Sequence, residues 1–171
     1  GSMYNFRAHT LRHLLKMNFD VIVVAPKDES SKLIVEMGCT FIHIPMNPKG
    51  VNPFADLVLL FKLSILYYRI KPNLIFHFTI KPNIYGTIAA SMLNIPIVNN
   101  IAGLGTLFIK QSIVTKIAKL LYRFSQEKAN KIFFQNQDDF ELFAKEALVE
   151  RDKCDILPGS GVDIEKFIPL E

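Results

Sequence analysis

Cysteine is scarce in this 171-residue sequence, and no motif for a metal ion is present. Cys39 and Cys154 lie far apart and form no C-x-x-C pair, which favours two reduced thiols in a cytosolic protein. His9 and His13 are spaced for one helix face, but no third ligand lies near them in the sequence. We therefore interpret these histidines as ordinary helix residues and expect no metal.

Long hydrophobic runs are also absent. The longest, residues 54–68, contains Asp56 and Lys62 and is shorter than the roughly 20 apolar residues that a membrane-spanning helix needs. No signal peptide follows Gly1 and Ser2, which we interpret as a cloning scar. Because 50% of the residues are hydrophobic, a folded core is indicated, and residues 3–171 are about one domain's worth.

Familiar catalytic motifs are missing as well. There is no P-loop, no Ser-His-Asp order and no carboxylate pair of recognisable spacing. Asp138 and Asp139 suit the first turn of a helix better than acid–base chemistry, and we interpret His77 as a hydrogen-bonded structural residue. The sequence thus identifies no catalytic residue. Its net charge of +4 admits nucleic acid, an anionic membrane or a phosphorylated substrate without choosing between them.

What the sequence does contain is a regular alternation of short apolar runs and helical patterns. Near-continuous apolar strands are typical of a parallel sheet, so we predict an α/β, Rossmann-like, doubly wound domain with a mostly parallel sheet. The strands are expected at residues 20–25, 40–44, 73–78, 96–100, 131–135 and 154–157. The helices are expected at residues 5–17, 29–37, 53–70, 82–93, 108–128 and 137–147.

One strand is missing from this order. A doubly wound domain normally begins with a strand near the middle of its sheet, whereas this chain begins with a helix. We expect an empty position between strands 20–25 and 73–78, with unpaired backbone groups on both edges. Since such edges attract other strands, we expect either a rearranged sheet or, by preference, an oligomer formed through a second copy of the chain.

A lysine lies where strand 73–78 ends and the next helix begins. Pro82 suits the first turn of that helix, and the residue before a proline is normally extended, which places Lys81 in the loop. Small residues such as Gly86, Ala89 and Ala90 allow the helix to pack closely on the sheet. Its free N–H groups, with Lys81 beside them, would form an anion site; the alternative is a solvated surface lysine.

Two glycine-rich turns are further candidates for ligand contact. Gly103 and Gly105 permit a positive φ or the close approach of a ligand, although a simple turn explains them equally well. They are not part of a G-x-G-x-x-G fingerprint, so a dinucleotide site is weakly indicated. The second turn, residues 157–163, by itself indicates only that the chain bends.

A basic amphipathic helix is predicted around residues 109–128. Lys116, Lys119 and Arg123 share one face, and few acids accompany them. The helix either lies on anionic lipid or presents an apolar stripe to the core. The stripe consists of Ile113, Val114, Ile117, Leu120, Leu121 and Phe124.

Six segments together carry a family resemblance: YNFR, DVIVVAP, HFTIKPNIYGTIAA, IPIVNNIAGLGTLFI, KIFFQNQDDFELF and ILPGSGVDIEKFIP. They resemble the N-terminal domain of GT-B glycosyltransferases of family four, from Tyr4 to Pro169. The nearest kin are bacterial enzymes that build capsule, O-antigen or other glycan chains on a polyprenyl diphosphate carrier. The resemblance implies two Rossmann-like domains with the active site in the cleft between them.

In that family the second domain binds most of the nucleotide-sugar and carries an E-x(7)-E signature, which this sequence lacks. The resemblance therefore implies an acceptor-side domain at residues 3–171 without a donor-binding domain, inactive alone, with a UDP-sugar as donor and no cofactor. The anion at Lys81 would be the diphosphate of a lipid-linked acceptor or a phosphate of the donor. The residues implied to bind substrate are Lys81, Asn83, Gly103, Gly105, Asn5, Arg7, Gly159, Ser160 and Gly161.

Two functions stay open. The first is a retaining glycosyltransferase, cytoplasmic and peripheral at the inner face of the plasma membrane, that transfers a sugar to a polyprenyl-diphosphate-linked acceptor. The second is a non-catalytic subunit that docks acceptor and membrane and needs a separate donor-binding chain. An unrelated NAD-binding protein is disfavoured by the missing first strand and its glycine loop. Nucleic acid is not expected as a partner.

Overall fold

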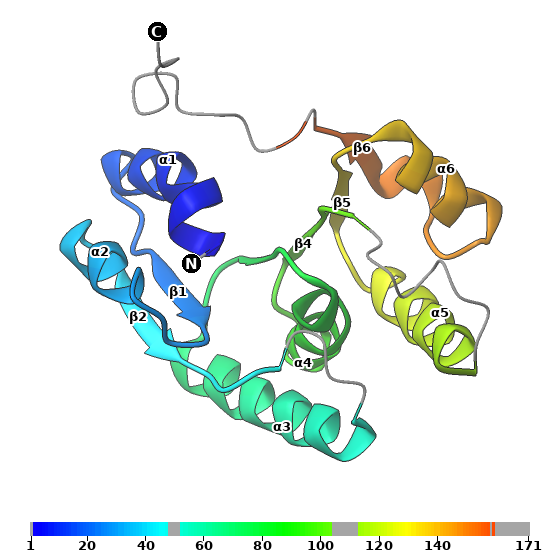
Figure 1. The fold of residues 1–171 in the computed structure, drawn as a ribbon, viewed down its shortest axis with the longest axis horizontal. Helices are drawn as coiled ribbons and strands as arrows, with labels where there is room; N and C mark the ends of the chain where they lie inside the picture. Colours follow the sequence, from blue (N-terminus) through cyan, green and yellow to red (C-terminus); the bar gives the residue numbers. More distant parts are fainter. Residues whose placement is uncertain (1, 48–51, 104–112, 158, 160–171) are drawn as a thin grey trace, which may run out of the picture. The chain divides into compact units, whose positions relative to one another are not determined.

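The computed structural model describes residues 2–47, 52–103, 113–157 and 159. These residues belong to two compact units, the first within residues 1–47 and the second within residues 48–159. Figure 1 shows the elements of both units along the chain.

The first unit is a pair of parallel strands with two helices. Its elements are α1 (Ser2–Lys16), β1 (Ile22–Ala25), α2 (Ser31–Glu36) and β2 (Thr40–His43). Ile22 lies opposite Thr40 in the strand register, and Ala25 lies opposite His43. The core of this unit consists of Leu11, Val23, Ile34 and Cys39.

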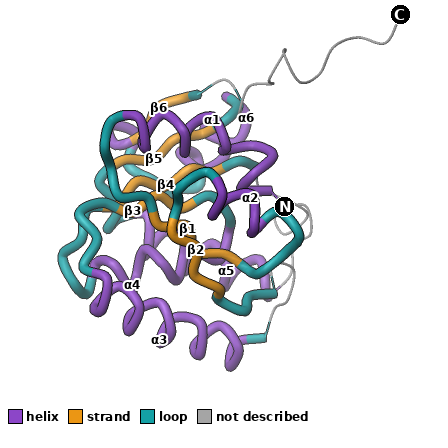
Figure 2. The backbone as a smooth tube through the Cα atoms, turned by 90° about the vertical axis from the view of Figure 1, so that its left-hand side faces the viewer, coloured by secondary structure: helices purple, strands orange, loops and turns teal. Residues whose placement is uncertain are grey.

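The second unit is built on a four-stranded parallel sheet in the order β3-β4-β5-β6 (Figure 2). The elements in chain order are α3 (Pro53–Ile70), β3 (Ile75–His77), η1 (Pro82–Gly86), α4 (Thr87–Ser91), β4 (Ile97–Ile101), α5 (Ile113–Gln126), β5 (Lys131–Phe134), α6 (Gln137–Lys145), η3 (Arg151–Lys153) and β6 (Cys154–Ile156). Because the strands follow chain order, right-handed crossovers place α4, α5 and α6 on one face of the sheet, as Figure 1 shows.

The first turn of α3 follows directly from its sequence. The Asn52 side chain accepts hydrogen bonds from the N–H groups of Phe54 and Ala55, at 3.0 and 3.3 Å, and Pro53 takes the first helical position. Asp56 also lies in this turn. It is buried, whereas many large apolar side chains of α3 are exposed. The helix start therefore places one carboxylate inside the unit.

The predicted order and parallel direction of the strands are confirmed, with boundaries shifted by at most two residues. The strands form a two-stranded and a four-stranded sheet, and among the described residues no pairing joins strands 20–25 and 73–78, between which the empty position was expected. In the described part of the chain, β1 pairs only with β2, and β3 pairs only with β4. The expected oligomer stays a prediction.

Candidate functional site

The helix that follows β3 begins earlier than its sequence suggests. Helical backbone runs without a break from Ile80 to Ser91, through a π-helical turn, η1, into α4. Lys81 has φ −66° and ψ −46°, so its predicted place in an extended loop was wrong. This conformation is disfavoured before a proline. It is held by the hydrogen bond from Asn83 N–H to the Thr79 carbonyl, 2.8 Å, and by the ion pair of Lys81.

Lys81 is paired inside the protein. The residue is only 9% exposed, and its Nζ donates to Asp56 Oδ1 at 2.5 Å. The hydroxyl of Tyr85 donates to the other carboxylate oxygen at 3.1 Å, and burial together with the Asp56 charge raises the pKa of Tyr85 to about 12. The solvated-lysine alternative is therefore wrong. An anionic ligand at Lys81 would have to compete with Asp56 for the same charge.

Beneath the helix lies a buried histidine. His77, the last residue of β3, places Nε2 at 3.1 Å from the Tyr67 hydroxyl and Nδ1 at 2.9 Å from Asn99 Oδ1. Burial lowers the pKa of His77 to about 4, and the Asn99 hydrogen bond offsets this only in part. The ring is therefore neutral near pH 7, with its proton on Nδ1 facing the Asn99 oxygen. The interpretation of His77 as a hydrogen-bonded structural residue is confirmed.

The same network reaches α5. Asn99 Nδ2 donates to Thr87 Oγ1 at 2.9 Å and to Gln126 Oε1 at 2.7 Å. Gln126 Nε2 donates in turn to the Asn83 carbonyl at 2.9 Å. Side chains from β3, β4, α4 and α5 thus fix the first turns of the helix, because His77, Asn99 and Gln126 each have defined partners.

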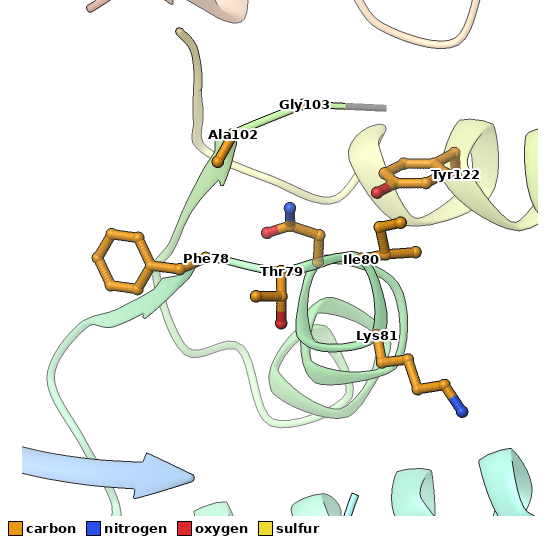
Figure 3. Close-up of a pocket in the computed structure, with 8 residues that line it drawn as sticks. Phe78, Thr79, Ile80, Lys81, Ala102, Gly103 and Tyr122 are labelled. Carbon is orange, nitrogen blue, oxygen red and sulfur yellow. The ribbon is translucent and has the colours of Figure 1, made fainter. Parts of the chain in front are cut away.

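A cavity of about 240 Å³ opens above this network, at the carboxyl ends of β3 and β4. Ligands of parallel α/β sheets bind at this edge. Figure 3 shows Ala102 and Gly103 on one side of the cavity, the helix start on the other and Tyr122 of α5 beside it, while Lys81 extends away from Gly103. The lining residues are Phe78, Thr79, Ile80, Lys81, Asn83, Ala102, Gly103 and Tyr122.

The structure brings together some of the predicted substrate residues. Lys81, Asn83 and Gly103 all line this cavity, and Gly103 has φ +142°, so the expectation of a positive φ is confirmed there. Gly159, with φ +67°, follows β6. Asn5 and Arg7 lie in α1 of the first unit, where burial lowers the pKa of Arg7. Gly105, Ser160 and Gly161 lie outside the described residues.

The helix α5 turns its apolar stripe outward. The exposed fractions are 77% for Ile113, 53% for Ile117, 68% for Leu120 and 51% for Phe124. A core-facing stripe is therefore wrong for these residues. The inner face is small or polar because it packs on η1 and α4 and completes the buried network. Its buried residues are Thr115, Ala118, Tyr122, Ser125 and Gln126.

One of the three basic residues on α5 has an acidic partner. Lys116 and Arg123 are exposed, but Lys119 forms an ion pair with Glu146, which follows α6, at 2.5 Å. The expectation that few acids accompany these bases is thus wrong for Lys119. None of the described helices is long and apolar enough to span a bilayer.

Sequence reasoning missed most of the polar residues around the site. Asp56 had one visible signal, since it is a lone acid in an apolar helical run. Tyr67, Thr87 and Asn99 had none, because their partners lie at least ten residues away in the chain. Within the described residues, no group of three His, Cys, Asp or Glu side chains could hold a metal ion.

Solved structures with a similar fold include GT-B glycosyltransferases and UDP-GlcNAc 2-epimerases. MurG from Acinetobacter baumannii is 14% identical, with a TM-score of 0.60 over 95% of this chain and 43% of that protein. HepE from Anabaena, in complex with UDP and glucose, is 14% identical, with a TM-score of 0.64 over 91% of this chain and 41% of that protein.

Sequence comparison then defines the family. The chain belongs to the glycosyl transferase 4-like family, because the sequence model of that family matches residues 2–136. A curated relative from Campylobacter jejuni is N,N'-diacetylbacillosaminyl-diphospho-undecaprenol alpha-1,3-N-acetylgalactosaminyltransferase. It is 26% identical to this chain over an alignment 175 residues long, and the alignment covers 99% of this chain. The chain spans 46% of the length of that relative.

Proposed function

We propose that this chain is the acceptor-side part of a retaining glycosyltransferase of bacterial surface polysaccharide or glycan synthesis. The enzyme would move a sugar from a nucleotide-sugar, expected to be a UDP-sugar, to a polyprenyl-diphosphate-linked acceptor. The observation that carries the proposal is the cavity at the carboxyl ends of β3 and β4, in a chain of this family. The name of the Campylobacter relative, which joins a diphospho-undecaprenol acceptor to sugar transfer, supports the acceptor class.

The described residues would act on the acceptor by holding it in place. The neutral His77 and its partners give the helix start a fixed position, so that groups lining the cavity are preorganised. Lys81 contributes a positive potential that Asp56 largely balances. No described residue is proposed as a nucleophile.

Product analysis tests the proposal. The protein at its natural length is incubated with a panel of UDP-sugars and an undecaprenyl-diphosphate-linked saccharide, and products are identified by mass spectrometry. We expect one added sugar, with at least a tenfold loss of kcat/KM in Asn83→Ala and none in Asn73→Ala, an exposed asparagine with no role in the cavity. Acceptor binding without product would instead favour the docking subunit, and neither binding nor product would contradict both.

We also propose that α5 lies on the inner face of the plasma membrane. Lys116 and Arg123 flank its exposed apolar stripe, and Lys128, which follows the helix and pairs with Glu127 at 3.4 Å, lies over the Phe124 ring of the stripe. This is the pattern of a helix that lies in an anionic interface, where each nearby base contributes about 1 kcal/mol.

Vesicle co-sedimentation tests this orientation. With vesicles that contain anionic lipid, Lys116→Glu/Arg123→Glu should bind about 30-fold more weakly, as about 2 kcal/mol of attraction is lost. Leu120→Ser should also weaken binding. The control is Arg12→Glu/Lys16→Glu, which reverses a matched pair of exposed bases on α1. Equal binding of all variants would show that α5 does not contact lipid.

A further inference from the structure

Within the described residues, one buried polar atom of a cavity-lining side chain has no hydrogen-bond partner. Asn83 is 2% exposed, and its Nδ2 donates to the Asn100 carbonyl at 3.0 Å. Because a carbonyl can only accept, this hydrogen bond fixes which end of the amide is the nitrogen. The other end, Oδ1, has no hydrogen-bond partner among the described residues, and Asn83 is one of the residues that line the cavity.

An unpartnered buried acceptor is costly, by about 1–3 kcal/mol, unless something supplies a hydrogen. The group that fits must be a donor, such as a hydroxyl or an amide N–H. A phosphate oxygen carries negative charge and would face the Asn83 oxygen unfavourably. The nearby cation does not compensate for this, since Lys81 Nζ is bound to Asp56.

The size of the cavity points the same way. Pockets for drug-sized ligands span about 300–1,000 Å³, so about 240 Å³ suits one ring rather than a whole nucleotide-sugar. Its walls are largely apolar, with the side chains of Phe78, Ile80 and Tyr122. Apolar walls with one fixed acceptor match the apolar face and the hydroxyl edge of a sugar.

We propose that this cavity binds a neutral sugar ring, through a hydroxyl or acetamido N–H donated to Asn83 Oδ1, and that it does not bind the diphosphate. The inference rests on the proposed glycosyl transfer and names the part of the substrate that this site takes. It replaces the diphosphate expected at Lys81 from the family resemblance.

Binding by the 171-residue chain tests the inference without any turnover. The side-chain amide of Asn83 and the backbone amide of Gly103 are followed by ¹⁵N NMR during titration with methyl N-acetyl-α-glucosaminide, and separately with inorganic diphosphate, to concentrations on the order of 10 mM. We expect the glycoside to shift both signals and diphosphate to shift neither. Asn83→Ala should abolish the Gly103 shift, whereas Asn73→Ala should preserve it.

Charge removal provides the second arm. Lys81→Met/Asp56→Leu removes both members of the ion pair and leaves no unpaired charge, so glycoside binding should change less than threefold. Diphosphate shifts at Asn83, or no glycoside shift at all, would overturn the inference. Since turnover is not measured, this outcome is separate from failure of the transferase assay. UDP-N-acetylglucosamine and farnesyl-diphospho-N-acetylglucosamine carry the same ring, and the one that shifts Asn83 at lower concentration identifies the donor or the acceptor as its source.

Discussion

A single methyl group at Gly86 should destabilise the second unit. A Cβ atom there would lie 2.4 Å from His77 Nε2, 2.9 Å from Cδ2 and 3.1 Å from Cε1. His77 has no room to move without losing its hydrogen bond to Tyr67 at 3.1 Å, because the ring is buried against the sheet. Contacts under 3.0 Å require a shift, so the helix or the ring must give way.

The magnitude follows from three terms. Overpacking costs about 1–3 kcal/mol, and a buried hydrogen bond left unmade costs about 1–3 kcal/mol. Replacing a helical glycine with alanine returns up to about 1 kcal/mol. We therefore expect Gly86→Ala to lower the free energy of unfolding by about 3 kcal/mol.

Urea unfolding measures this effect. The sequence has no tryptophan and five tyrosines, of which all but Tyr4 lie in the second unit, so tyrosine fluorescence reports mainly on that unit. Ser91→Ala on the same helix is the control and should change the stability by less than about 0.5 kcal/mol.

A double-mutant cycle separates the clash from a general intolerance of the helix. In the His77→Ala background the added methyl has space, so Gly86→Ala should there cost less than about 1 kcal/mol, a coupling of about 2 kcal/mol or more. If Gly86→Ala costs as much without the imidazole as with it, the close approach to His77 is not the cause and the reasoning fails.

Three further changes probe the surroundings of the site. The pKa of His77 is about 4 in the folded protein and about 6.5 when unfolded, so its contribution to the free energy of unfolding is complete above pH 6.5 and falls by about 3 kcal/mol as the pH drops to 4. In urea unfolding, His77→Gln should lack this part of the pH dependence. Parallel plots of unfolding free energy against pH for the two proteins would contradict the prediction. Asp56→Leu should cost about 3–5 kcal/mol because Lys81 is left buried and unpaired, whereas Lys81→Met/Asp56→Leu should be nearly neutral in the same assay; a double variant as unstable as the single one would refute the charge argument. Asn52→Ala should cost about 1 kcal/mol through loss of the helix cap of α3, and an unchanged urea midpoint would show that the cap is dispensable.

Local patterns in the sequence were sufficient to predict the helices and strands of the fold. Apolar β-branched runs predicted the strands, and the acids at 138 and 139 predicted a first helical turn that the structure confirms. These features depend on neighbours within a few residues, which a single sequence displays directly.

Contacts across the chain were not predictable in this way. The charge of Lys81 is balanced by Asp56, 25 residues earlier, and no spacing rule connects the two. The stripe on α5 shows a second limit, because helical periodicity tells which residues share a face and not whether that face covers a core. Thr115 and Ala118 are buried instead of Ile117 and Leu120, since the inner side of α5 lies against a closely packed helix start.

The two faces of α5 join the proposed site to the proposed membrane surface. Gln126 and Tyr122 reach the helix start and the cavity, while Leu120 and Phe124 are exposed on the opposite face of the same helix. A helix with its side chains is about 10–12 Å in diameter, so a membrane against the outer face would lie within about one helix diameter of the cavity. A polyprenyl chain that stays in the bilayer, with its diphosphate at the interface, could then present the first sugar at the depth of Asn83. The neutral cavity would thus bind the sugar of the acceptor, and the basic outer flank of α5 would lie near its charged diphosphate.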